Sequence, residues 1–215
     1  MRKYIGLFVI LFAVGATGAF ASSTMNFMGM GYLEPIENYY NGGFAGFGSG
    51  PGPNFGVVWG ADSLALPNGS GSNVENEPFG WTSSMIFLSG PGDIMNVAGG
   101  FTTGFSFYYA APYYSGTVDV YDGPDGTGNV MASLSLPVNG SYCDGLLAYT
   151  CWTEVGVAFS GTAMSANFTG TANYIAFSGV TIGSSTVGTP EPSSLLLLGS
   201  GLLGLAGTLR RKINL

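Results

Sequence analysis

The distribution of positive charge constrains this chain more than any other feature of its sequence. All five Lys and Arg residues lie in the first three and last six positions, and there is no His. Residues 22–188 therefore have no cationic side chain, although they contain every Asp and Glu except Glu191. Without side-chain salt bridges, this stretch must be held together by apolar packing and backbone hydrogen bonds, and solvent cations must offset the repulsion between its carboxylates.

The same absence excludes several classes of function. Nucleic-acid binding requires Lys and Arg to displace the counterions of the phosphates, so we expect no nucleic-acid partner. A nucleophilic Ser or Cys has no His or Lys to activate it, and a His-ligated zinc or iron site is excluded. The remaining chemistry is that of carboxylate pairs, tyrosine hydroxyls and hard cations bound through oxygen.

The N-terminal 21 residues have the order of a secretory signal peptide. Arg2 and Lys3 precede the apolar run "YIGLFVILFAVGA", and Ala19-Phe20-Ala21 places small residues where signal peptidase reads them. This pattern predicts cleavage after Ala21. An uncleaved N-terminal anchor is the alternative, and either interpretation predicts that the following residues are exported.

The C-terminal segment, residues 189–215, has three ordered parts. Pro190-Glu191-Pro192 is followed by the apolar residues 193–209 and then by Arg210, Arg211 and Lys212. A helix over 193–209 would be about 26 Å long, close to the hydrocarbon core of a bilayer, and the cations would stay on the cytoplasmic side. A buried core helix is the alternative, but "LLLLGSGLLGLAG" offers no polar face. We therefore expect a transmembrane helix.

These three parts together resemble the PEP-CTERM sorting signal of Gram-negative bacteria. The resemblance implies that a membrane-embedded exosortase recognises the segment and cuts near Pro-Glu-Pro. It also implies delivery to the cell envelope, outer surface or extracellular matrix, with residues 193–209 as a transient or stable membrane anchor. It predicts the destination of the protein and leaves the function of residues 22–188 open.

Cys143 and Cys151 flank "DGLLAYT" in a chain that is expected to be exported. An oxidising compartment and an even number of cysteines favour a disulfide that closes this loop. Free buried thiols or a metal pair are the alternatives, and a metal would need more ligands than two cysteines provide.

Residues 22–188 are expected to form one all-β domain, because apolar and polar residues alternate along them and no helical period persists. The clearest strands are expected in the segments 105–109, 117–121, 130–136 and 155–159, with others in 56–60, 64–66, 84–89 and 94–98. "YDGPDGTGN" predicts a hairpin turn, and the change of apolar phase at Ser178-Gly179 predicts a bulge or tight bend. Short strands with Gly-rich turns favour a β-sandwich.

The order of segments resembles exported PEP-CTERM proteins with a galactose-binding-like jelly roll. The segments are "EPIENYYNGG", "GPNFGVVWGADSLAL", "GFTTGFSFYYAAP", "VDVYDGPDGTGNVMASLSLP" and "IAFSGVTIG". The resemblance implies sugar binding by loops at one end of the sandwich, often with a structural calcium ion. Within the first third, "YYNGGFAGFGSGPGPNFG" is a flexible linker or an ordered loop, and its repeated aromatic residues favour order.

Two groups of residues are candidate sites. Asp119, Asp122 and Asp125 lie around one hairpin and offer the oxygen ligands that calcium prefers, but a solvated turn is the alternative. Aromatic rings stack on the apolar faces of sugars, and most aromatic residues here are expected in the core. Trp152, beside the disulfide loop, and Tyr113 and Tyr114, beside Pro112, are the aromatic residues expected to be exposed and to bind ligand.

Three functions remain open for the exported domain. It is expected to be non-catalytic and to bind an extracellular polysaccharide or another matrix component. A glycosidase or lyase is the first alternative, but it needs two facing carboxylates, and no such pair is recognisable in the sequence. A structural matrix component without a specific ligand is the second.

Overall fold

We describe the protein from a computed structural model, which covers residues 22–69, 71–87, 92–143, 145–171 and 174–188. These residues form nine β-strands and three short 3₁₀ turns, and every strand pair is antiparallel. The strands are β1 Ser23–Met25, β2 Val57–Trp59, β3 Ser63–Pro67, β4 Ser83–Phe87, β5 Ile94–Ala110, β6 Gly116–Tyr121, β7 Val130–Leu136, β8 Thr153–Asn167 and β9 Ala176–Ile182. The turns are η1 Pro78–Gly80, η2 Pro124–Gly126 and η3 Thr169–Thr171.

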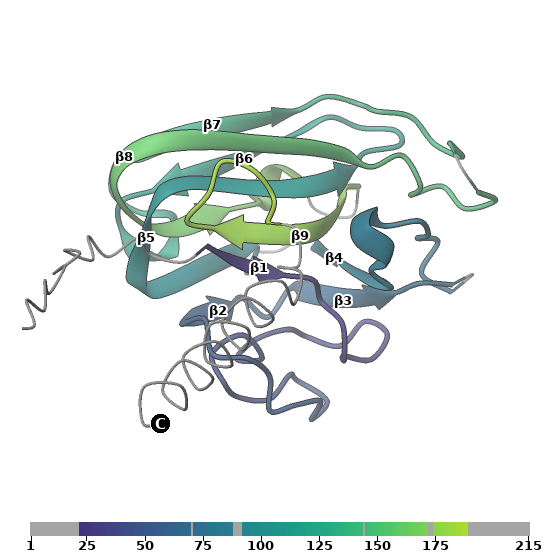
Figure 1. The fold of residues 1–215 in the computed structure, drawn as a ribbon, viewed down its shortest axis with the longest axis horizontal. Helices are drawn as coiled ribbons and strands as arrows, with labels where there is room; N and C mark the ends of the chain where they lie inside the picture. The colour runs from purple at the N-terminus through teal and green to yellow at the C-terminus, as the bar shows by residue number, and fades with distance from the viewer. Residues whose placement is uncertain (1–21, 70, 88–91, 144, 172–173, 189–215) are drawn as a thin grey trace, which may run out of the picture.

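Two long strands, β5 and β8, give the sheet its sandwich shape. The strand order is β3-β4-β9-β5-β8-β6-β7, with β1 added to β9 and β2 added to β5. The first part of β5 pairs with β2 and the end of β8, whereas its second part pairs with β9 and the start of β8. Both strands turn back at the left of Figure 1, so the continuous sheet folds into two layers. The expected all-β sandwich is confirmed.

Glycines lie where these two strands bend. The register between β5 and β8 shifts between Asn96 and Phe101, where Gly99 and Gly100 leave the regular ladder, and Gly100 has a φ of 66°. In β8, Gly161 has a φ of 95°. Only glycine adopts such angles without steric cost, so the bends are placed by the sequence.

The space between the layers is filled by aromatic side chains. Phe168 stacks on Phe87 with a centroid distance of 4.7 Å and meets Phe177 edge-on at 5.1 Å. Phe107 approaches Phe177 at 5.2 Å. Trp59 and Trp81 are also buried, as expected for most of the aromatic residues. Such packing supplies the stability that salt bridges cannot provide in a domain without cations.

The predicted strands are found within the described residues; the segment 84–89 corresponds to β4, and its residues 88–89 lie outside the described part. Two strands differ in extent. The segments 94–98 and 105–109, expected as separate strands, are parts of the continuous β5, and β8 extends eight residues beyond the predicted 155–159 to Asn167. The intervening glycines suggested breaks but produce bends instead. The bulge predicted at Ser178-Gly179 is confirmed, because the register between β5 and β9 shifts there and Gly179 has a φ of 62°.

The segment between β1 and β2 is an ordered loop that is built around one buried carboxylate. Glu34 is buried and accepts hydrogen bonds from the N–H groups of Gly31 (2.6 Å), Phe47 (3.0 Å) and Ser49 (3.0 Å), and from the Ser49 hydroxyl (2.6 Å). Burial alone would raise the pKa of Glu34, but these hydrogen bonds outweigh it and lower the pKa. The loop interpretation is therefore confirmed over the linker alternative.

Candidate functional site

The loop closed by the disulfide lies at one end of the sandwich, at the right of Figure 1. The disulfide predicted between Cys143 and Cys151 is present. The loop is also tied to residues 73–75, which are distant in sequence: Tyr149 donates its N–H to the Asn73 carbonyl at 3.1 Å, and Glu75 donates its N–H to the Tyr149 carbonyl at 3.3 Å. Backbone hydrogen bonds thus join two segments that are distant in sequence into one surface.

Asn139 holds the base of this loop in place. Its side-chain amide donates to the carbonyl groups of Tyr109 at 3.1 Å and Cys151 at 2.7 Å, and its side-chain oxygen accepts the N–H of Ala111 at 2.8 Å. These bonds join the end of β5 to the connection between β7 and β8. Asn139 was not predicted as a structural residue, because in the sequence it is one more Asn in a Gly-rich turn.

Four exposed tyrosines form two pairs that are joined by the neighbouring residues Tyr113 and Tyr114, and we call them the tyrosine surface: Tyr113, Tyr114, Tyr142 and Tyr174. Their exposed fractions are 57%, 56%, 56% and 49%. The rings of Tyr114 and Tyr174 lie 4.5 Å apart. A hydrogen bond with Tyr142 raises the pKa of the Tyr113 hydroxyl, which places these two side chains side by side. The surface draws on three segments, namely the residues after β5, the residue directly before the disulfide loop and the residues before β9.

Tyr113 and Tyr114 are exposed, as predicted, whereas the exposure predicted for Trp152 is wrong. The Trp152 ring is half-buried against the small cluster of Leu66, Val74 and Ala176, and its Nε1 donates to the Glu75 carbonyl at 3.0 Å. Ligand binding by Trp152 stays a prediction. Tyr142 and Tyr174 were not predicted, because nothing in the sequence distinguishes them from the core tyrosines.

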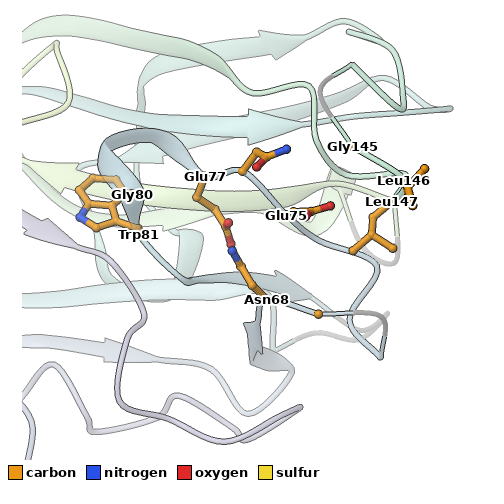
Figure 2. Close-up of a pocket in the computed structure, with 10 residues that line it drawn as sticks. Asn68, Glu75, Glu77, Gly80, Trp81, Gly145, Leu146 and Leu147 are labelled. Atoms are coloured by element: carbon orange, nitrogen blue, oxygen red, sulfur yellow. The ribbon is translucent and has the colours of Figure 1, made fainter.

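A pocket of about 700 Å³ lies between residues 68–81 and the disulfide loop (Figure 2). Its lining residues are Asn68, Gly69, Glu75, Asn76, Glu77, Gly80, Trp81, Gly145, Leu146 and Leu147. The carboxylates come from the segment before η1, and the leucines come from the disulfide loop. The sequence analysis did not single out Glu75 and Glu77, because the pocket exists only once the two segments meet.

Glu77 is the buried acid of this pocket. Its side chain is 4% exposed, and neither carboxylate oxygen has a partner of ordinary hydrogen-bond geometry among the described residues. Burial raises its pKa to about 7, and the nearby charge of Glu75 adds to the rise. The Asn68 amide, which faces Glu77 in Figure 2, and the N–H of Glu77 itself offset part of this effect.

The three aspartates predicted to bind calcium each have another partner. Asp122 accepts the Asn129 N–H at 2.6 Å and the Asn129 side-chain amide at 2.8 Å, and these bonds lower its pKa. Asp125 accepts the Asn96 amide at 2.7 Å, and Asp119 accepts the Ser133 hydroxyl. The described residues contain no group of three or more acidic or Cys side chains that is arranged to hold a metal. Calcium binding at this hairpin stays a prediction.

The sorting signal predicted at the C-terminus is supported by comparison with known proteins. Residues 189–212 match the PEP-CTERM protein-sorting motif. The match includes Pro190, Glu191, Pro192 and the three basic residues 210–212, and it indicates an exported protein that an exosortase processes. The signal peptide and residues 189–215 lie outside the described residues. No helix in the described part is long and apolar enough to cross a membrane.

A comparison with curated proteins gave no match. Solved structures with similar strand arrangements include carbohydrate-binding modules. One is the module CBM6cm-2 of Cellvibrio mixtus lichenase 5A in complex with cellotriose (10% identity, 59% of this chain and 90% of that chain, TM-score 0.38). Another is a β-1,3-glucan-binding CBM6 of Bacillus halodurans (13% identity, 56% of this chain and 84% of that chain, TM-score 0.39). These TM-scores are low, so function is inferred from this chain's own residues.

Proposed function

We propose that this exported domain binds extracellular polysaccharide at the tyrosine surface and has no catalytic activity. The observation that carries the proposal is the presence of two exposed tyrosine pairs, one of which includes Tyr142 directly before the disulfide-bonded Cys143. Aromatic rings in water gain free energy by stacking on the apolar faces of sugar rings. Because the disulfide and Asn139 hold the surrounding backbone, little conformational entropy is lost when a ligand binds.

The charge of the domain favours a neutral polysaccharide over an acidic one. Residues 22–188 contain no Lys, Arg or His, so no side chain can pair with a uronate or sulfate group. Their carboxylates repel such groups at low ionic strength. The PEP-CTERM motif supports the proposal because it indicates export, and an exported domain encounters extracellular polysaccharide.

Affinity electrophoresis of the full chain in mild detergent tests the proposal. Gels contain a neutral polysaccharide (β-glucan, xyloglucan or galactomannan) or the anionic polygalacturonate. We expect a neutral polysaccharide to retard the protein and polygalacturonate not to do so. Replacing both Tyr113 and Tyr114 by Ala should weaken retardation about tenfold or more, because each lost stacking contact contributes roughly 1 kcal/mol.

Phe47→Ala is the matched control, because Phe47 is 72% exposed and belongs to the loop between β1 and β2. Its retardation should equal that of the wild type. Absence of retardation by every neutral polysaccharide would favour the structural-component alternative. Release of reducing ends during the assay would favour the glycosidase or lyase alternative.

A further inference from the structure

We propose that the pocket lined by Asn68, Glu75, Glu77, Trp81, Leu146 and Leu147 is a second binding site, which takes the protonated amine of an amino sugar against Glu77. The site is separate from the tyrosine surface and does not depend on the function proposed for it. It is formed by residues 68–81 on one side and by the disulfide loop on the other (Figure 2).

The first step of the argument is the unsatisfied carboxylate. Glu77 is more than nine-tenths buried and lines the pocket, yet the described residues offer its oxygens no partner of ordinary hydrogen-bond geometry. A buried acceptor without a partner destabilises the fold, so such groups are rare unless a ligand or water satisfies them. A ligand that donates hydrogen bonds in the pocket removes this cost.

The second step is the charge of the pocket. Among the described residues, Glu75 and Glu77 are the titratable side chains that line the pocket, and Glu75 is close enough to raise the pKa of Glu77. Residues 22–188 contain no cation to neutralise either carboxylate. A Cβ atom at Gly145 would lie 2.7 Å from Oε2 of Glu75, so the loop backbone lies directly against that carboxylate. A positively charged ligand is therefore favoured.

The third step distinguishes an ammonium group from a metal ion. Calcium takes six to eight oxygen ligands, and the described residues contain no cluster of three acidic side chains to begin such a shell. An ammonium group donates only three hydrogen bonds, fewer than the ligands calcium requires, and the carboxylates of Glu75 and Glu77 line the pocket as acceptors. Trp81, Leu146 and Leu147 form apolar walls that can pack against a carbon skeleton but cannot coordinate a bare ion.

The fourth step concerns the body of the ligand. A volume of about 700 Å³ is typical of pockets for small organic molecules and exceeds the space that an ammonium group needs. The pocket combines several polar acceptors with apolar walls. Sugars have the matching combination of hydroxyl groups and apolar ring faces. An amino sugar therefore offers an amine for the carboxylates, hydroxyl groups for the polar lining and a ring face for the apolar walls.

Calorimetric titration of the full chain with glucosamine and with glucose at pH 6.5, where the sugar amine is protonated, tests this site. The two sugars differ at one position, amine against hydroxyl. We expect glucosamine to bind at least tenfold more tightly than glucose. Glu77→Gln, which keeps the size of the side chain and removes its charge, should abolish this difference. Asp125→Asn, the same charge change on the exposed η2 turn, should preserve it.

Proton release gives a second readout that does not depend on a variant. A carboxyl group with a pKa of about 7 is roughly three-quarters protonated at pH 6.5, and a bound ammonium group drives it to ionise. Titrations in buffers of different ionisation enthalpy should therefore show release of more than half a proton per glucosamine bound. Equal affinity for the two sugars, or no proton release, would overturn the proposal.

The tyrosine variant separates this site from the proposed function. The protein with Tyr113 and Tyr114 replaced by Ala should bind glucosamine as the wild type does, even where it no longer binds neutral polysaccharide. A parallel loss of glucosamine binding in this variant would show that the amine binds at the tyrosine surface, and it would overturn the assignment to the pocket.

Discussion

Glu34 is the residue on which the ordered loop between β1 and β2 depends most. Its carboxylate accepts three backbone N–H groups and one hydroxyl. In a Glu34→Ala variant these donors lose their acceptor, and we expect the free energy of unfolding to fall by about 2–4 kcal/mol. Urea unfolding at pH 7 measures this loss. Glu37→Ala, three residues away, is the control; an equal effect of the two substitutions would contradict the role of Glu34.

The lowered pKa of Glu34 also predicts the direction of a pH effect. Its stabilising contribution is complete above the ordinary glutamate value of 4.5 and is lost as the pH falls through the lowered folded-state pKa. In the wild type, acid therefore removes this contribution progressively below about pH 4.5. The difference in stability between wild type and Glu34→Ala should shrink over the same range.

Residue roles of this kind were only partly predictable. Exposure of Tyr113 and Tyr114 followed from their place beside Pro112 and was confirmed. Glu34 and Glu37 looked equivalent in "EPIENYY", because the donors that distinguish Glu34 come from residues 31, 47 and 49. Glu77 was likewise unremarkable until the fold buried it. A side chain whose role depends on distant backbone cannot be recognised from its own neighbours in the sequence.

At the scale of elements, the disulfide loop supports both candidate surfaces. Tyr142 directly precedes the loop, and the loop itself contributes the pocket residues Leu146 and Leu147. Replacing Cys143 and Cys151 by Ser releases a loop with a sequence separation of 8. We expect stability to fall by about 2–3 kcal/mol, because the unfolded chain is no longer constrained. Thermal unfolding measures the change.

Leu146→Ala, a substitution inside the same loop at a side chain that is 91% exposed, leaves the disulfide intact and is the control for this experiment. It should leave the melting temperature nearly unchanged. Reduction of the wild type should reproduce the effect of the double Ser variant. If neither reduction nor the double variant lowered the melting temperature, the loop would be held by its hydrogen bonds to residues 73–75 alone.

Elements were easier to predict than sites. Alternation predicted β6, β7 and the hairpin between them, because each pleat exposes one face and buries the other. It did not predict that β5 continues through Gly99 and Gly100, because a glycine pair is compatible with either a turn or a bend. The meeting of residues 68–81 with the disulfide loop depends on long-range packing, which local patterns do not record.

For the molecule as a whole, the uncompensated negative charge predicts a response to salt. Residues 22–188 contain eleven carboxylates and no cation, so their mutual repulsion opposes folding. Sodium chloride screens this repulsion and should raise the melting temperature, with most of the rise complete by about 0.15–0.5 M. A melting temperature that is constant or falls with salt would contradict this prediction.

Calcium chloride at matched ionic strength separates screening from a specific site. A larger rise than in sodium chloride, saturating with free calcium, would support the calcium site expected around Asp119, Asp122 and Asp125. Loss of that extra rise in Asp122→Asn would assign it to this hairpin. Equal melting temperatures in the two salts would leave screening as the whole effect and reject the calcium site.

The most direct test of polysaccharide binding is to observe the tyrosine rings themselves. The full chain is labelled with fluorotyrosine and titrated with an oligosaccharide of the neutral polysaccharide that retards it most. We predict saturable shifts of the resonances of Tyr113, Tyr114, Tyr142 and Tyr174, while those of the buried Tyr40 and Tyr109, each 2% exposed, stay in place. Unchanged resonances of the four surface tyrosines at saturation would contradict binding at this surface.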